Sequence, residues 1–376
     1  MGHAISKLTI KGYKSIRNLE NFELRNLNIL IGPNGAGKSN FVSFFEFIST
    51  VAGSRMQSYI SENGGANFLL HLGVQKTQEL KVSFEFNEWI DWNFISSLTK
   101  TNNLIFREES IKCGESSYSR EEAKYAGDGD SNATSIIDGF LFPVDQQAGT
   151  SLGEGIESIR AAIINWGIYH FHNTGDYAEV KYPCSKRDYE YLRPDASNLA
   201  AFLLRLKKKH QREYSFIREV IQLAAPFFDD FWLREEEDKD EILLEWRQKG
   251  SDYPFHPSQI SDGTLRFICL ATALLQPNPP STILLDEPEL GLHPYALTLL
   301  ASLIQKASIQ TQVIVSTQSA PLIDHFKPED IIIVERQNGE SIFKRLNKAD
   351  LKVWLDDYSL GDLWQMNVFG GRPSYE

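Results

Sequence analysis

The residues best suited to chemistry lie near the start of the chain, where residues 32–39 read GPNGAGKS. The pattern G-x-x-x-x-G-K-[ST] is typical of a loop whose backbone N–H groups surround the phosphates of a nucleotide. The Lys38 ammonium would reach the β- and γ-phosphates of ATP, and the Ser39 hydroxyl would bind Mg²⁺. We therefore expect a phosphate site built from Asn34, Gly35, Gly37, Lys38, Ser39 and Asn40.

The segments on either side of this loop have the character that the loop needs. Residues 27–31 read LNILI, typical of a buried strand, and residues 40–50 read as a helix rich in aromatics. Glycines let backbone amides approach phosphate oxygens, and the start of a helix adds partial positive charge. A chance glycine-rich turn is a poor explanation for an eight-position match between a strand and a helix.

A second chemical cluster follows a short apolar stretch, where residues 282–288 read TILLDEP. A buried strand can hold a carboxylate at its tip against Mg²⁺, and Asp286 fits that role. Glu287 can then orient or deprotonate the attacking water. An ordinary acidic turn is the alternative, and the four buried-type residues before Asp286 argue against it.

A third cluster precedes a helical pattern, where residues 260–266 read ISDGTLR. Ser261 is a good N-cap residue, Gly263 allows close backbone approach, and a helix N-terminus binds anions. Ser261 lies 222 residues after Ser39 (261 − 39). This third cluster could therefore contact the γ-phosphate of a second ATP molecule rather than the one in its own loop.

The pattern of apolar and polar residues along the chain predicts an α/β protein in three segments: 1–112, 113–254 and 255–376. The first would contain strands and the phosphate loop. The second would contain an irregular Gly/Ser/Asp-rich connection over 113–157, a helical stretch over 197–225 and a charged hairpin tip over 235–241. The third alternates strands with a helix, typical of a mainly parallel covered sheet, at residues 282–285, 294–307, 312–316 and 330–334.

Net charge, apolar runs and cysteine number limit the kinds of partner and compartment that we expect for this chain. A net charge of −12 means that any contact with DNA needs a local basic patch, and two candidates exist, at residues 7–17 and 205–212. No apolar run approaches the ~18 residues that span a bilayer, so we expect no membrane contact. Three widely spaced cysteines favour reduced thiols and a cytoplasmic protein.

With these motifs the chain resembles the ABC-type AAA-family ATPase heads of the SMC/RecF/OLD class. It looks most like the stand-alone, OLD-like bacterial ATPases that lack a Toprim nuclease domain. The resemblance rests on residues 8–16, 32–40, 261–264, 286–294 and 358–364, with a weaker match at 194–200. It implies a P-loop NTPase fold, an ABC-ATPase-like head with two lobes and a helical insertion.

The resemblance also implies a head-to-tail homodimer that holds two ATP molecules, each with Mg²⁺, between its subunits. Residues 32–39, Asp286 and Glu287 of one subunit would face residues 261–263 of the other. ATP would close this dimer and hydrolysis through Glu287 would release it, because a ligand favours the form that binds it better. Higher oligomers stay open.

The chain departs from the class in three ways. Gln318 stands where the class usually has histidine, and because glutamine cannot take a proton we predict binding with slow hydrolysis. No long coiled coil is present, which excludes a chromosome-spanning tether. Only 42 residues follow Val334 (376 − 334), too few for a Toprim domain, so a separate effector such as a nuclease or toxin would supply any such activity.

Several residues keep more than one interpretation. A glutamine that contacts Mg²⁺ in this class could be Gln75 or Gln78, and Arg160 or Arg187 could approach phosphate. Residues 170 and 172 are histidines two apart, which could bind a metal, but no carboxylate or cysteine partner is near them in the sequence. An ordinary strand is the better interpretation there.

The leading functional hypothesis is a slowly hydrolysing ATP switch in bacterial anti-phage defence or another DNA-linked process. The alternative is a RecF-like repair factor that binds DNA directly in its ATP state. A transporter ATPase subunit is disfavoured, because the spacing to Ser261 is long and SDGT departs from SGGQ. A nucleotide-dependent scaffold stays open because of Gln318, although Lys38, Asp286 and Glu287 argue against it.

Overall fold

The computed structural model describes residues 4–87, 89–99, 102–121, 135–138, 151–235 and 238–371. Two six-stranded sheets dominate it. The first is antiparallel throughout, in the order β2-β1-β4-β5-β6-β7. Its strands are β1 (Ile5–Tyr13), β2 (Ile16–Glu23), β4 (Glu79–Phe86), β5 (Ile90–Leu98), β6 (Leu104–Cys113) and β7 (Ser116–Glu121).

The second sheet has the order β17-β16-β3-β15-β14-β8, and only β17 is antiparallel to its neighbour. Strand β3, from the start of the chain, lies between two strands from its end. All residues of β3, β14 and β15 are buried, as expected for parallel strands covered on both faces. The strands are β3 (Leu27–Ile31), β8 (Gly167–Tyr169), β14 (Thr282–Asp286), β15 (Gln312–Thr317), β16 (Ile331–Gln337) and β17 (Glu340–Arg345).

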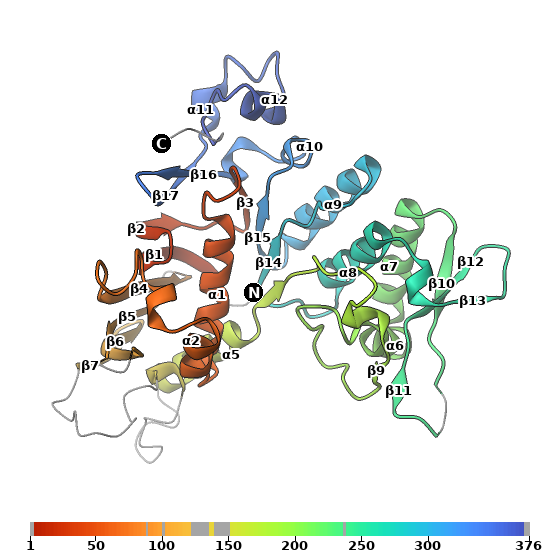
Figure 1. Ribbon diagram of the computed structural model, residues 1–376, viewed down its shortest axis with the longest axis horizontal. Coiled ribbons are helices and arrows are strands. Elements are labelled where there is room, and N and C mark those ends of the chain that lie inside the picture. The colour runs from red at the N-terminus through yellow and green to blue at the C-terminus, as the bar shows by residue number, and fades with distance from the viewer. Residues whose placement is uncertain are drawn as a thin grey trace.

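Helix α1 (Lys38–Ala52) lies between the two sheets (Figure 1). Its aromatic residues are buried, and Phe44 stacks on Phe84 of the first sheet while Phe45 contacts Trp166. Alternate residues of the second sheet face α1 and the opposite side, where α8 (Asp262–Leu275) and α9 (Pro294–Ala307) pack. The sheet that carries the phosphate loop is therefore covered on both faces.

A third part of the molecule, green in Figure 1, packs beside α8 and α9. It contains α6 (Leu199–Lys209) and α7 (Gln211–Ala224), which meet at His210. Small sheets flank these helices, built from β9 (Cys184–Ser185), β10 (Phe228–Trp232), β11 (Glu241–Ile242), β12 (Glu245–Gln248) and β13 (Pro254–Phe255).

The remaining helices are short or lie at the periphery. The α-helices are α2 (Met56–Glu62), α3 (Ala66–Leu69), α5 (Ser151–Ile164), α10 (Ala320–Ile323), α11 (Lys348–Leu351) and α12 (Leu360–Gln365). The 3₁₀ helices are η1 (Ile136–Asp138), η2 (Glu179–Lys181), η3 (Pro257–Gln259) and η4 (Pro328–Asp330). Within the described residues, no helix combines the length and apolar character that crossing a membrane requires.

The α/β fold and the strand–helix pattern of the last third agree with the sequence-based expectations. The irregular connection expected over 113–157 is regular at both ends, because residues 116–121 pair with β6 and α5 packs on α1. The helical stretch over 197–225 is two helices rather than one. The charged tip over 235–241 lies partly outside the described residues, and the division into three segments stays a prediction.

Candidate functional site

The loop of residues 32–39 connects β3 to α1 at the carboxyl edge of the second sheet. Gly37 has a φ of 107°, and a Cβ atom there would lie 2.0 Å from Ser341 Oγ. A Cβ on Gly32 would lie 2.1 Å from the carbonyl oxygen of Val334. Both glycines are therefore required by close contacts with the β16–β17 hairpin, in addition to any contact with a ligand. Gly35 and Asn34, by contrast, are exposed.

Lys38 is buried at the start of α1, and its ammonium bends back into the loop. Nζ donates to the carbonyl oxygens of Gly32 at 2.8 Å and Pro33 at 3.1 Å. Burial lowers the pKa of this lysine, while Glu287 and Asp286 act in the opposite direction. A cation that has lost most of its water and faces a group of acids can give a strong interaction with phosphate.

Asp286 ends β14, and its side chain is only 8 % exposed. Among the described residues its Oδ1 atom is buried without a hydrogen-bond partner. A buried, unpartnered carboxylate oxygen is unfavourable unless a donor or a cation meets it. The donor set therefore fits Mg²⁺, for which carboxylate and hydroxyl oxygens are suitable ligands, and the exposed Ser39 offers the hydroxyl.

Glu287 follows Asp286 in a left-handed conformation, with φ of 42°, and its backbone N–H donates to the carbonyl oxygen of Ser316 at 2.7 Å. A non-glycine residue rarely adopts this conformation, so the contact with β15 holds it there. Its Oε1 atom accepts a hydrogen bond from Nε2 of Gln318. Glu287 and Gln318, predicted separately as catalytic residues, are therefore in direct contact.

Glu289 is a further acid at this edge of the sheet, to which the sequence analysis assigns no role. Its Oε1 atom accepts from Thr317 Oγ1 at 2.6 Å and from the backbone N–H of Gln318 at 2.9 Å. Burial raises the pKa of Glu289, and these two hydrogen bonds oppose the rise. Glu289 thus fixes the backbone from which the Gln318 amide reaches Glu287. The acid two residues after Glu287 was visible in the sequence, but its partner was not.

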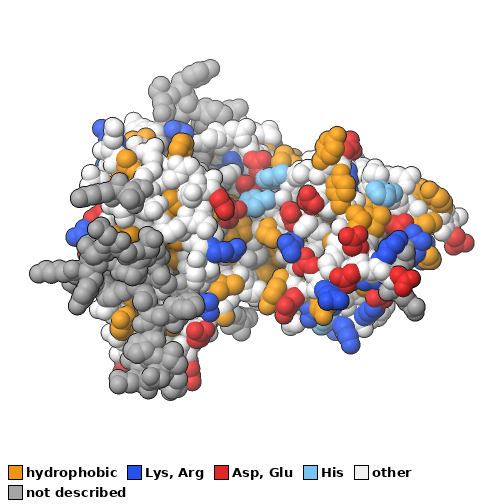
Figure 2. Space-filling model, turned by 60° about the horizontal axis from the view of Figure 1, so that its bottom comes forward, with side chains coloured by type: hydrophobic (Ala, Val, Ile, Leu, Met, Phe, Trp, Pro, Cys, Tyr) orange, Lys and Arg blue, Asp and Glu red, His pale blue; other side chains and the backbone are white. Residues whose placement is uncertain are grey.

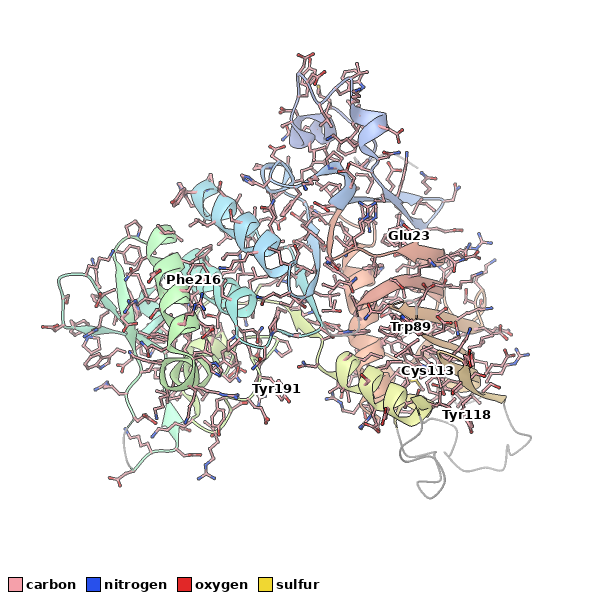
Figure 3. The ribbon with its side chains drawn as sticks, turned by 180° about the vertical axis from the view of Figure 1, so that it is seen from behind. Glu23, Trp89, Cys113, Tyr118, Tyr191 and Phe216 are labelled. Carbon is pink, nitrogen blue, oxygen red and sulfur yellow. The ribbon has the colours of Figure 1, made fainter. Side chains whose placement is uncertain are left out.

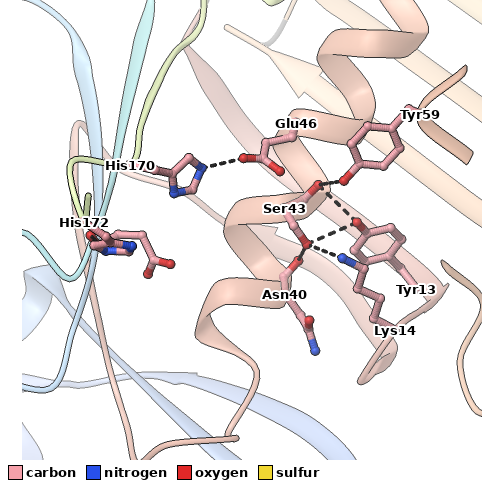
Figure 4. Close-up of polar contacts among 9 residues, drawn as sticks. Tyr13, Lys14, Asn40, Ser43, Glu46, Tyr59, His170 and His172 are labelled. Atoms are coloured by element: carbon pink, nitrogen blue, oxygen red, sulfur yellow. Dashed lines mark hydrogen bonds and ion pairs between the residues drawn. The ribbon is translucent and has the colours of Figure 1, made fainter. Parts of the chain in front are cut away.

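Two histidines after β8 connect this edge of the sheet to α1 (Figure 4). His172 Nε2 lies 2.7 Å from the carbonyl oxygen of Asp286, and His170 Nε2 contacts the carboxylate of Glu46. The hydrogen bond to Glu46 raises the pKa of His170. No carboxylate lies near these histidines in the sequence, but the fold brings one from α1, 124 residues away.

The start of α8 has the capped geometry that the sequence predicts. Ser261 Oγ accepts from the backbone N–H of Thr264 at 3.3 Å, and the Ser261 side chain is exposed. A Cβ on Gly263 would lie 2.3 Å from the carbonyl oxygen of Gly291, so glycine lets α8 pack on the segment after β14. No hydrogen bond among the described residues joins Ser261 to the phosphate loop of the same chain.

Arg266, also on α8, connects three segments of the site. Its Nε and Nη2 atoms donate to the carbonyl oxygens of Phe171 and His172, both at 2.7 Å. Nη1 donates to the carbonyl oxygen of Leu290. Burial lowers the pKa of this guanidinium. One side chain therefore joins the capped helix to the segments that follow β8 and β14.

Comparison with known proteins identifies the family. A family described as "AAA domain, putative AbiEii toxin, Type IV TA system" matches residues 27–324. The chain belongs to this family. It is an AAA/ABC-type P-loop ATPase, and the match includes the phosphate loop, the capped helix and the acids after β14. Membership of the OLD class stays a prediction.

Solved structures agree on the fold of this AAA-domain protein. One is an SmcHead bound to the C-winged helix domain of ScpA, with TM-score 0.58, 17% identity and coverage of 92% of this chain and 98% of that one. Another is an Smc head domain with an extended coiled coil bound to the C-terminal domain of ScpA, from Pyrococcus furiosus, with TM-score 0.55, 16% identity and coverage of 94% and 98%. These likenesses show an ABC-ATPase-like head. No curated protein matches the chain.

Other predicted site residues of this AAA-domain ATPase are exposed or are already bonded to other segments. Gln75 and Gln78 are exposed next to β4 in the first sheet. Arg187 pairs with Asp240 at 3.3 Å. Asn40 donates through Nδ2 to a serine of the β1–β2 turn at 2.7 Å, so its amide is already engaged. The side chain that the fold places next to Asp286 is that of His172.

Acids pair with most cations of the first candidate DNA patch, but with only part of the second. In the first hairpin the pairs are Lys7–Glu85, Lys11–Glu20 and Arg17–Glu340. In the second run they are Lys207–Asp230 and Lys208–Glu235. Paired cations have less charge available for phosphates, so the first hairpin is a weak candidate for DNA binding. The second run keeps part of its positive charge, because Arg205 has no ion pair among the described residues.

Proposed function

We propose that this ATPase is a cytoplasmic, homodimeric switch that ATP closes and that slow hydrolysis reopens. The observation that carries the proposal is the contact between Glu287 and Gln318, set beside buried Asp286 and Lys38. This arrangement can hold an attacking water and bind nucleotide phosphates. Residue 318 is a glutamine here, whereas the class usually has a histidine at this position.

The residues at the loop fit Mg²⁺·ATP. Lys38 and the backbone amides of Gly35 and Gly37 would hold phosphate oxygens, while Ser39 and Asp286 would hold the metal. When bound, Mg²⁺·ATP supplies the γ-phosphoryl group and a metal that neutralises the charge developing on it.

Glu287 is the group that would accept the proton of the attacking water. One of its oxygens, Oε1, accepts from Gln318 Nε2, which leaves the other oxygen for water. Gln318 fixes the direction of that carboxylate but has no atom that takes up a proton near neutral pH. We therefore infer that the site binds ATP well and hydrolyses it slowly.

The dimer is inferred from the capped helix. Ser261 is exposed and has no hydrogen bond to its own phosphate loop among the described residues, so it is available to ATP held by a second subunit. Closing a head-to-tail pair would complete two sites at once. Both solved SMC heads described above are bound to a ScpA domain, which supports a separate partner protein here as well.

For this chain the partner would be an effector, such as a nuclease or a toxin, in a bacterial defence or DNA-linked process. The alternative, direct DNA binding of the RecF kind, has less support, because the chain has a net charge of −12 and most cations of its first basic hairpin are paired with acids. Salt-sensitive DNA binding that appears only with ATP would favour the alternative.

The proposal is tested by the mass of the protein in solution without nucleotide, with Mg²⁺·ATP, and for Glu287→Gln with Mg²⁺·ATP. We expect the variant to stay in a larger species that the parent forms only transiently. Glu219→Gln, on the exposed face of α7, is the matched control and should behave like the parent. A mass that does not respond to ATP in any of these would contradict the switch.

A further inference from the structure

A cleft of about 800 Å³ lies between helices α1 and α5 on one side and the part of the molecule that contains α6 and α7 on the other, away from the phosphate loop. This second part is called the helical part below. One wall comes from α1 and α5, the other from residues 190–194 and α6, and β8 lies at the bottom. Figure 2 shows this hollow with Lys or Arg side chains on both sides. Its volume is in the range of small-ligand sites, roughly 300–1,000 Å³.

Two half-buried arginines face the cleft from opposite walls. Arg160 on α5 has a buried Nε atom without a hydrogen-bond partner among the described residues, and its ion pair with Glu157 is 3.9 Å long. Arg205 on α6 donates through Nη1 only to the backbone carbonyl oxygens of Tyr189 and Glu190, at 3.2 and 3.3 Å. Neither guanidinium therefore has a close carboxylate that neutralises its charge.

The other charges of the cleft leave this positive centre in place. Glu46 is already paired with His170, and the side chains of Glu157 and Glu190 are exposed toward solvent. The side chain of Arg55, exposed at the rim, forms no hydrogen bond or ion pair among the described residues. The inner part of the cleft thus favours an anion.

An aromatic side chain adds a second kind of contact. Tyr191 is 65% exposed and lies at the edge of the helical part that faces α5 (Figure 3). Guanidinium groups match the geometry of phosphate, and an exposed tyrosine ring can stack on a base. A single inorganic phosphate would fill only a small part of the volume.

We propose that this cleft is a second binding site, separate from the ATP site, for a phosphate-bearing ligand of about dinucleotide size. Its floor, β8, pairs with β14, which ends at Asp286. A ligand held between Arg160 and Arg205 would therefore lie one strand away from the metal-binding carboxylate.

The probe is a fluorescent 5′-phosphorylated diadenylate, titrated by anisotropy against a Lys38→Ala background in which the phosphate loop no longer competes. We expect saturable binding that Arg160→Gln and Arg205→Gln each weaken about tenfold, the effect of losing one charge-assisted contact. Arg160→Lys should recover part of the affinity. Arg234→Gln, which breaks an ion pair with Glu245 outside the cleft, should change nothing.

Two results would overturn the proposal. One is the absence of saturable binding up to about 1 mM, or binding that ignores both arginine substitutions while thermal unfolding shows all variants folded. The other is a 20-nucleotide single strand that binds more than about tenfold tighter than the diadenylate through the same arginines, because the cleft would then be a nucleic-acid groove. Neither result depends on ATP closing a dimer, so this test is independent of the switch.

Discussion

Replacing Gln318 by alanine should slow ATP hydrolysis about 10- to 150-fold without weakening ATP binding. The variant removes the hydrogen bond from Gln318 Nε2 to the Glu287 carboxylate. A hydrogen bond to a charged group is worth about 1.5–3 kcal/mol, and each 1.4 kcal/mol changes a rate about tenfold. Lys38 and the loop glycines would hold the phosphates. None of the described hydrogen bonds joins them to the Gln318 side chain, so the substitution leaves the phosphate contacts in place.

The assay is single-turnover phosphate release with protein in excess over Mg²⁺·ATP, together with a titration of ATP affinity. The control is Gln222→Ala, which removes an amide bonded to the carbonyl oxygen of Asp229 at 2.7 Å, in the helical part. It should hydrolyse at the parental rate. A Gln318→Ala rate within about twofold of the parent, with the protein folded and ATP bound, would refute the role assigned to this contact.

Gln318→His tests the slow-hydrolysis inference separately. Histidine can still donate to Glu287, and it can also take up a proton near neutral pH. We expect faster turnover than in the parent. An equal or slower rate would mean that the residue at position 318 does not limit hydrolysis.

Three further predictions concern the frame around the site. Gly37→Ala places a Cβ atom 2.0 Å from Ser341 Oγ at a φ of 107°, so it should lower the free energy of unfolding by about 2 kcal/mol or more, measured by thermal unfolding, and abolish nucleotide binding. Arg266→Met leaves three carbonyl oxygens without their donor and should cost about 3 kcal/mol in urea unfolding, of which Arg266→Lys recovers little. The pKa of His170 is raised above 6.5 by Glu46, so the stabilisation from this pair is complete below pH 6.5 and is lost as the pH rises through the folded-state pKa. The difference in melting temperature between the parent and His170→Gln should therefore shrink from pH 6 to pH 9, and a constant difference would contradict the ion pair.

The parts of the site that could be predicted are those where neighbours along the chain determine the structure. Residues 282–286 form a strand because the four residues before Asp286 suit a buried parallel strand, and Pro294 begins α9 where proline is tolerated. In the phosphate loop, Gly37 adopts a positive φ angle that favours glycine. Spacing alone thus located the strand–loop–helix unit and the acids after β14.

Contacts between distant residues could not be predicted. Glu46 meets His170 across 124 residues, and Glu289 meets Thr317 only because β14 and β15 are parallel neighbours. The acids that pair with the basic runs were equally hidden, since Glu340 lies 323 residues from Arg17. Periodicity carries no information about such pairings, because tertiary packing determines them.

The position of β3 has a consequence for how the protein is made. Leu27 pairs with Val313, so 286 residues (313 − 27) separate the phosphate-loop strand from one neighbour, and its other neighbour, β16, comes later still. At synthesis rates of roughly 5–20 residues per second, about 15–60 s pass between the synthesis of the apolar strand β3 and that of its neighbour β15. During that time two unpaired strand edges and the aromatic face of α1 are open to wrong contacts. Nascent or truncated chains should therefore depend on chaperones and be cleared by proteases, and no N-terminal fragment that carries the loop should bind nucleotide by itself.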